Sequence, residues 1–405
     1  MQNNVDLILF GATGFTGRQT ADYIASHTAP GELRWAVAGR NAAKLKIVAD
    51  KARAAGHDVE EIVANSDDSA TIDAMVERGR VIVTTAGPFA KYGEPVIAAC
   101  ARLGRDYLDI TGETPWARRM IDRYGAQAAE SGARVVPFCG FDSVPSDLGA
   151  WLAVRALQEA GEEPALVQCL FSAKGGFNGG TLASAFHIAE HEKPRDLAHP
   201  FLLDPDPDKR KPLWSEHRDP LKPWRVDALE RWAGPFFMAP INSRVVRRSE
   251  ALFAGYGEGY GEAFAYREGM LASRGLGQVA AWSLAGAQAG FAAALSTPGV
   301  SSVVRKLGPK PGEGPSDATM DGGFFRAKVV AKSASGVTAI GEVSGSGDPG
   351  NRVTVRILCE AALALLFNRD ELPERSGFLT PATAFEDVLV ERLRAAGMTL
   401  VVSVA

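Results

Sequence analysis

The strongest constraint in this sequence is a glycine-rich turn at residues 11–17. An apolar run over residues 5–10 precedes the turn, and apolar residues at helical spacing follow it from 15 to 24. Glycines permit a tight turn, let the backbone approach a pyrophosphate and let a helix pack closely on a strand. The free N–H groups at the start of such a helix attract phosphate. The turn therefore predicts a dinucleotide site formed by Gly11, Ala12, Thr13, Gly14, Phe15, Thr16 and Gly17.

These glycines are spaced G-x-x-G-x-x-G rather than G-x-G-x-x-G, so the prediction also depends on the surrounding elements. Short apolar runs alternate with helical patterns as far as residue 138, which is typical of a parallel, doubly wound sheet. The fold class is therefore α/β, with an N-terminal Rossmann domain over residues 1–142. After the first strand, we expect strands at 34–39, 59–64, 80–85, 106–110 and 133–138.

The regular alternation of strands and helices ends after Pro145, and a chain of 405 residues is long enough for more than one core. We expect a second, α+β substrate domain over residues 143–375. The proline- and tryptophan-rich stretch 194–240 is predicted to be a long, ordered loop, and a role as a lid is left open. Residues 376–405 are expected to form a C-terminal helix and strand, and their return to the first domain stays open. The expected elements of the second domain are strands at 166–172, 259–266, 324–334 and 337–344 and an amphipathic helix at 352–366.

Arg40 follows the second strand, where an NAD enzyme places an acid on the ribose hydroxyls. A guanidinium at this point suits a 2′-phosphate, so the cofactor is predicted to be NADP. Asn41 and Lys44 are further predicted contacts, although a solvated helix face is an equal interpretation of Lys44. The end of the fourth strand lies on the rim that the cofactor crosses, which adds Thr85, Ala86, Gly87 and Pro88.

Charge and cysteine usage narrow the partners and the compartment. The net charge is -4 and no basic tract is present, so nucleic acid is not an expected partner. The four cysteines are widely spaced and the start lacks a secretory pattern, which favours the cytoplasm. Residues 275–304 carry no charge; a buried helix is the favoured interpretation, with membrane contact left open. No metal is expected, because the H-x-x-E-H pattern at 187–191 lacks an evident third ligand.

Several motifs together resemble the saccharopine dehydrogenase-like oxidoreductases, most closely the branch of trans-acting enoyl reductases. The resemblance spans nearly the whole chain. It implies an NADP-binding Rossmann domain, a following α+β domain, reductase activity and an acyl or lipid substrate. It supplies no catalytic residue. The motifs are the glycine turn, Ala38-Gly39-Arg40-Asn41, Thr85-Ala86-Gly87-Pro88-Phe89, and the segments 140–149 and 310–316.

Reduction of an enoyl thioester requires a proton donor and a hydrogen-bond donor for the enolate oxygen. Tyr92 and Asp142, near the expected domain junction, are the predicted catalytic residues. The neighbouring Ser143, Ser146 and Asp147 are equally well explained as caps of the helix that begins there.

Three functions stay open at this point. The first is an NADPH-dependent reductase of an apolar α,β-unsaturated substrate. The second is C–N chemistry on an amino acid, with Arg244, Arg247 and Arg248 holding carboxylates. The third is a non-catalytic, lipid-associated NADP-binding protein. Peripheral membrane contact and a homodimer are further open expectations.

Overall fold

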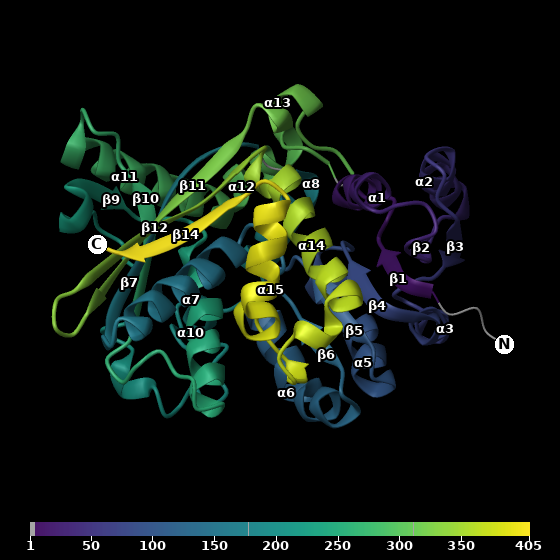
Figure 1. Cartoon of the computed structure of the whole chain (residues 1–405). Coiled ribbons are helices and arrows are strands. Elements are labelled where there is room, and N and C mark those ends of the chain that lie inside the picture. The colour runs from purple at the N-terminus through teal and green to yellow at the C-terminus, as the bar shows by residue number, and fades with distance from the viewer. Residues whose placement is uncertain (1–4, 177, 311) are drawn as a thin grey trace.

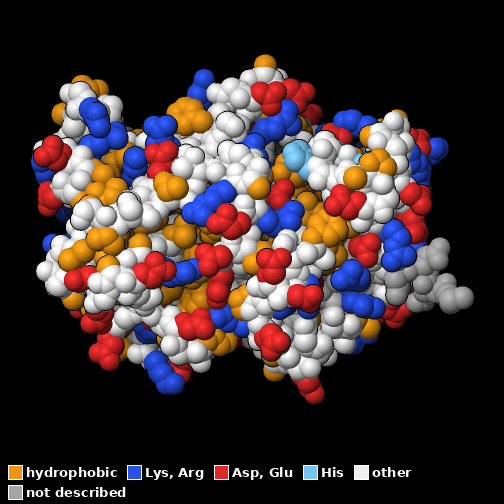
Figure 2. Space-filling view, viewed as in Figure 1, with side chains coloured by type: hydrophobic (Ala, Val, Ile, Leu, Met, Phe, Trp, Pro, Cys, Tyr) orange, Lys and Arg blue, Asp and Glu red, His pale blue; other side chains and the backbone are white. Residues whose placement is uncertain are grey.

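The computed structural model describes residues 5–176, 178–310 and 312–405. Two seven-stranded sheets form its two halves, and helices α14 and α15 lie beside the first sheet (Figure 1). Charged side chains of both signs are interspersed over the face in Figure 2.

The first sheet is parallel throughout, with strand order β13-β6-β5-β4-β1-β2-β3. This is the doubly wound arrangement, in which the strand order reverses beside β1. The expected strands are confirmed, with one further strand contributed by the C-terminal region. Their bounds are β1 (Val5–Phe10), β2 (Trp35–Gly39), β3 (Val59–Val63), β4 (Gly79–Thr84), β5 (Asp106–Asp109), β6 (Arg134–Val136) and β13 (Gly377–Phe378).

Alternation along β1 sends side chains into two cores. Leu7 and Leu9 join the core shared with α1, α2 and α14, whereas Ile8 and Phe10 join the core shared with α3, α5 and α6. Helices therefore cover both faces of the sheet, which explains its nearly continuous apolar strands. The helices are α1 (Phe15–His27), α2 (Ala42–Ala54), α3 (Ser69–Arg78), α4 (Phe89–Tyr92), α5 (Glu94–Leu103), α6 (Thr114–Ser131) and α14 (Thr354–Phe367).

The second sheet is mixed, with order β14-β12-β11-β7-β10-β9-β8, and only the β7–β10 pair is parallel. Val167, Cys169 and Phe171 of β7 face the large core beneath α7, while Leu170 faces a small core on the opposite side. The strands are β7 (Pro164–Lys174), β8 (Trp224–Val226), β9 (Arg231–Gly234), β10 (Ala265–Leu271), β11 (Phe324–Ser333), β12 (Thr338–Ser346) and β14 (Thr399–Val404). The remaining helices are α7 (Val144–Glu159), α8 (Gly179–His191), α9 (Pro194–Leu197), α10 (Ala239–Gly255), α11 (Gly277–Ser296), α12 (Pro298–Leu307), α13 (Asp317–Asp321) and α15 (Pro381–Ala395).

The C-terminal half crosses between the two sheets. After β12, helix α14 packs on α1 and on the first sheet, and β13 pairs with β6. Helix α15 then contacts α7 and α14, and β14 completes the edge of the second sheet. The two sheets therefore share one continuous core, which includes residues of β1, α7, β7 and α14.

Three local expectations are wrong. The strand expected at 259–266 lies later, as β10, because Gly257 and Gly261 adopt left-handed backbone conformations and keep the chain in turns before it. The helix expected at 352–366 is α14, which follows a π-helical turn at Pro349–Val353. It is not amphipathic as expected, because α1, the first sheet and α15 bury it on most sides.

The third concerns the uncharged stretch 275–304. It forms α11 and the start of α12, and α11 lies on the surface rather than in a core: Leu276, Val279 and Trp282 are exposed, and Ala281 is buried. The cause is that α11 packs along one side only, against β9, β10 and α8. In the described part of the chain, α11 alone is long and apolar enough to cross a membrane, judged by length and composition. Of the 18-residue apolar window within it, 6% is buried.

A buried arginine fastens the two halves together. The two terminal nitrogens of Arg248 on α10 donate to the carbonyl oxygens of Leu203 and Phe378, each at 2.6 Å, and burial lowers its pKa to about 10. Arg248→Met would leave both carbonyls without these charged donors, so we expect the free energy of unfolding to fall by about 3 kcal/mol. Urea denaturation measures this change. Arg225→Met is the control, because the exposed Arg225–Asp227 pair contributes roughly 0–1 kcal/mol. Equal losses in the two variants would contradict the role of Arg248.

Candidate active site

The predicted site residues gather at the carboxyl edge of the first sheet. The loops after β1, β2, β4, β5 and β6 all leave the sheet at this edge, since its strands are parallel. The point where the strand order reverses lies between β1 and β4, and ligands of open α/β sheets bind outside that point.

The turn after β1 is closely packed. Gly11 has φ +83°, and an added Cβ would lie 2.8 Å from the backbone nitrogen of Ala86. A side chain at Gly17 would collide with the carbonyl oxygen of Gly11. Gly14 is the cap residue of α1 and has no side chain that accepts a hydrogen bond, and among the described residues no other side chain accepts the first-turn N–H groups of α1. This arrangement fits a pyrophosphate, which takes the place of such an acceptor.

Arg40 is exposed immediately after β2 and, within the described ranges, its guanidinium has no hydrogen-bond or ion-pair partner. Asn41 caps α2: its side-chain oxygen accepts the backbone N–H of Lys44 at 3.0 Å. The side chain of Asn41 is thus engaged in the fold, whereas the Lys44 ammonium group lies on the exposed first turn of α2. The unpaired guanidinium group of Arg40 is suited to a phosphate on the ribose.

The loop after β4 rests on the glycine turn. The Thr85 hydroxyl donates to the carbonyl oxygen of Gly11 at 3.2 Å, and Ala86 makes the close approach to Gly11 described above. Gly87 and Pro88 are partly exposed and lead into α4. The side chain of Ser184, on α8 of the other half, lies 3.8 Å from the position of a Cβ on Gly87. The loop therefore lies between the two halves.

Glu113 is a residue that the sequence analysis missed. Its carboxylate is buried and accepts the backbone N–H groups of Phe89 at 2.8 Å and Ala90 at 2.9 Å. It also accepts the hydroxyl of Ser184 at 2.9 Å. One carboxylate thus ties the loop after β4 to α8. The available signal was its position shortly after β5, but its partners lie 23 to 71 residues away and carry no local pattern.

The segment 310–316 closes over the glycine turn; of its residues, Pro311 lies outside the described part. The carbonyl of Glu313 accepts the N–H of Gly179, at the start of α8, at 2.9 Å. Gly314 packs against the ring of Phe15, and Arg18 donates to the carbonyls of Thr13 and Gly312 at 2.8 and 3.2 Å. This segment therefore holds the second half of the molecule against the N-terminus of α1.

Asp142 stands out among the carboxyl groups. It follows β6, and its Oδ2 lies 3.8 Å from the position of a Cβ on Gly112, next to Ile241. Its side chain is half-buried and, among the described residues, its carboxyl group has no hydrogen-bond partner; desolvation raises its pKa to about 7. The adjacent Ser143 hydroxyl is buried and also unpaired. A protonatable acid and a free hydroxyl are therefore side by side in sequence at this edge.

Tyr92, the other predicted catalytic residue, ends α4. Its side chain is partly buried, with the ammonium group of Lys91 5.1 Å from its ring centre. The 112–113 segment contacts the surroundings of both predicted residues: Glu113 binds the start of α4, which ends at Tyr92, and Gly112 adjoins Asp142.

Other polar groups near the junction are engaged in the fold. Ser146 donates to Glu268 at 2.9 Å, and Asp147 accepts the N–H of Ala382 at 2.8 Å, so both lie in helix α7 with partners of their own. Ser143 stands at the cap position of α7 but makes no capping hydrogen bond.

The arginines considered for carboxylate binding are buried, and each donates to backbone carbonyl oxygens. Arg244 binds the carbonyls of His199 and Leu197 and pairs with Asp219. Arg247 binds Pro200 and Tyr266 at 2.9 and 3.3 Å, and Arg248 holds Leu203 and Phe378. In this structure these guanidinium groups hold the chain around α10, and their nitrogens donate to the carbonyl oxygens just named rather than to a free site.

Comparison with known proteins identifies an NADP-binding domain in the first part of the chain. Residues 7–136 match the family described as the saccharopine dehydrogenase NADP binding domain. The chain is 38% identical, over 98% of its length and 96% of the relative's, to a Mycobacterium tuberculosis protein provisionally named a trans-acting enoyl reductase. It is 35% identical to the trans-acting enoyl reductase of Mycobacterium ulcerans, over 98% of each chain.

A solved structure shares the fold. Apo saccharopine dehydrogenase (L-Glu forming) from Saccharomyces cerevisiae superimposes with a TM-score of 0.58 over 99% of this chain and 100% of that one, at 14% identity. The predicted NADP-binding Rossmann domain, the second mixed domain and the resemblance drawn from the motifs are confirmed. The chain belongs to the saccharopine dehydrogenase-like oxidoreductases, in the branch of the trans-acting enoyl reductases.

Proposed function

We propose that this oxidoreductase uses NADPH to reduce the double bond of an apolar α,β-unsaturated acyl thioester. The observation that carries the proposal is the Asp142 carboxyl group, with a pKa raised to about 7, followed in sequence by the buried hydroxyl of Ser143; neither group has a hydrogen-bond partner among the described residues. Reduction of an enoyl group needs these two functions, a proton for the α-carbon and a donor to the thioester oxygen.

The residues around the first sheet would hold NADPH. The backbone of 14–17 would bind the pyrophosphate, and Arg40 with Lys44 would bind the 2′-phosphate. The residues 85–88 would line the path toward the second half of the molecule. When bound, NADPH supplies the hydride that goes to the β-carbon.

In this proposal the side chains of the protein transfer a proton and stabilise the negative charge that develops on the substrate. Burial keeps the Asp142 carboxyl group partly protonated near neutral pH, so it would release its proton to the α-carbon. The Ser143 hydroxyl would donate to the thioester oxygen as negative charge develops there. Ile241, next to Gly112, adds an apolar wall. The engaged state of Arg244, Arg247 and Arg248 weighs against an amino acid substrate.

The substrate class can be measured directly. Loss of NADPH absorbance is followed with 2-enoyl thioesters of increasing chain length, beside a panel of amino acid and keto acid pairs. We expect turnover on the enoyl thioesters that improves with chain length, because an apolar wall binds longer chains better by about 0.8 kcal/mol per buried methylene. Turnover on the amino acid panel alone would replace the proposal with C–N chemistry, and no turnover on either panel would favour a binding protein.

The cofactor assignment makes a second prediction. Arg40→Ala should weaken NADPH binding by about 1.5–3 kcal/mol, the range for a hydrogen bond to a charged group, and leave NADH binding unchanged. Fluorescence titration measures both affinities. Arg34→Ala is the matched control, because Arg34 is exposed at the opposite end of the same strand, where it pairs with Asp6. If NADPH affinity survives in Arg40→Ala, another residue holds the 2′-phosphate.

The third prediction concerns the acid. Wild-type kcat should fall as the pH rises through about 7, because the proton on Asp142 is then lost. Asp142→Asn should lower kcat by about 10²- to 10⁴-fold and abolish that pH dependence. Asp142 has no partner to lose, so Asp142→Asn should unfold no more easily than wild type at pH 8, and thermal unfolding checks this.

Asp147→Asn is the matched control for the acid. Burial also raises the pKa of Asp147 to about 7, but its carboxylate is hydrogen-bonded within the fold. This variant should lose stability and keep the pH dependence of kcat. The assignment of Asp142 fails if Asp142→Asn retains the wild-type rate and profile.

A further inference from the structure

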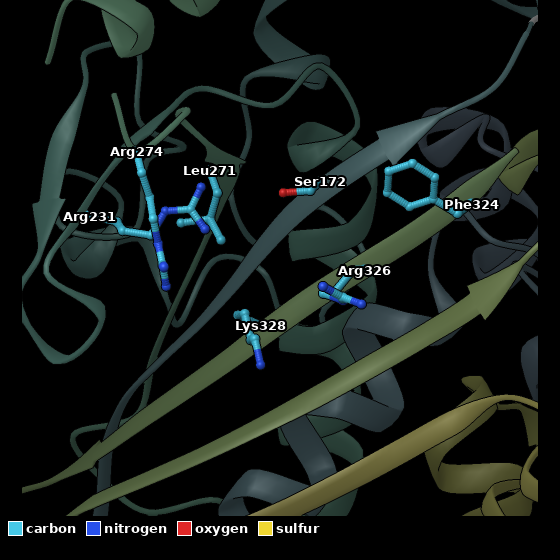
Figure 3. Close-up of a pocket in the computed structure, with 7 residues that line it drawn as sticks. All are labelled: Ser172, Arg231, Leu271, Arg274, Phe324, Arg326 and Lys328. Atoms are coloured by element: carbon cyan, nitrogen blue, oxygen red, sulfur yellow. The ribbon is translucent and has the colours of Figure 1, made fainter. Parts of the chain in front are cut away.

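A cavity lies away from the sheet edge just described, on the outer face of the second sheet. It has a volume of about 590 Å³ and opens between β9, β10, β7 and β11 (Figure 3). Side chains alternate along β11, so Phe325 and Ala327 face the core while Arg326 and Lys328 face this cavity. Ser172 of β7, paired with Arg326 across the strands, lines it as well.

Four cations surround the cavity. Arg231 and Arg274 lie next to one another on one side, and Arg326 and Lys328 approach from β11 (Figure 3). Arg326 and Lys328 share one carboxylate, that of Glu342, at 3.1 and 2.8 Å. Arg231 and Arg274 have no carboxylate within ion-pairing distance among the described residues; Glu230 lines only the adjoining cavity. Positive charge therefore exceeds negative charge at the site.

The arrangement of the two guanidinium groups of Arg231 and Arg274 is energetically unfavourable without a ligand. One terminal nitrogen of Arg231 donates to the carbonyl oxygen of Ala272 at 2.6 Å, but its Nε is buried and has no acceptor among the residues that the structure describes. Burial, together with the nearby charge of Arg274, lowers the pKa of Arg231. A buried donor without an acceptor and two adjacent like charges each cost free energy, and a bound anion would relieve both.

The chemistry of the lining restricts the anion. Guanidinium groups bind phosphate through parallel hydrogen bonds, and the Ser172 hydroxyl and the Lys328 ammonium group add further donors. The exposed ring of Phe324 and the side chain of Leu271 provide apolar walls. We propose that this cavity is a second ligand site that binds the phosphate group of a ligand whose remaining part is largely uncharged. The inference does not depend on the reaction proposed above.

The test is binding in solution. Because the NADP site also binds phosphate, the protein is first saturated with NADPH. Inorganic phosphate, glycerol 3-phosphate and phosphatidylglycerol vesicles are then titrated, by calorimetry for the soluble probes and by sedimentation for the vesicles. We expect at least one probe to bind, with an affinity that falls about tenfold or more in the Arg231→Gln, Arg274→Gln double variant and weakens at high salt.

Two further variants make the result decisive. Arg274→Gln alone changes an exposed side chain, so it should fold normally and still lose several-fold affinity. Arg225→Gln, on the neighbouring strand and paired with Asp227, should bind as wild type does. Glycerol 3-phosphate binding that the vesicles do not reproduce identifies a soluble phosphate ester, and variant-sensitive vesicle binding identifies a lipid headgroup. Absence of binding to all three probes, or equal binding in every variant, would overturn the proposal.

Discussion

The close approach of three backbone segments around Gly11 is the constraint on which the site depends. Helix α1 can start beside the end of β1 only because residue 17 has no side chain to meet the Gly11 carbonyl, and the loop after β4 can approach only because residue 11 has none to meet Ala86. The N–H groups of α1 and the rim at 85–88 are thereby brought to one point of the sheet edge. Glu113 then extends the same contact to α8 of the other half.

Buried carboxyl groups show how one chemical group serves two purposes. Burial raises the pKa of Asp147, of Glu268 and of Asp142 to about 7. Glu268 accepts hydrogen bonds from Ser146, Tyr266 and Asn242, and Asp147 is similarly satisfied, so these two groups hold helices together. Asp142 is only partly buried, and among the described residues it has no such hydrogen-bond partners. An uncompensated polar group at the edge of a cofactor domain is therefore a stronger indication of chemistry than a shifted pKa alone.

Sequence periodicity predicted the first half of the molecule well, because both faces of its sheet are covered and each strand is a short apolar run. The same reasoning was weaker in the second half. The absence of charge in 277–296 suggested burial, yet α11 is exposed, since composition does not say whether another element lies against a helix. The reverse holds for α14, whose position between α1, the first sheet and α15 buries nearly all of it.

The sequence by itself determined the glycine turn, the parallel sheet, the cation after β2 and the family, because each depends on residues that are close together in the chain. Only the tertiary structure decided which polar groups are free. Arg248 reaches Phe378, 130 residues away, and Ser184 reaches Glu113 across 71 residues, whereas Asp142 has no partner in the described part of the chain. Hydrogen bonds at such separations have no periodic signature, and they decide whether a buried charge holds the fold or is available for chemistry.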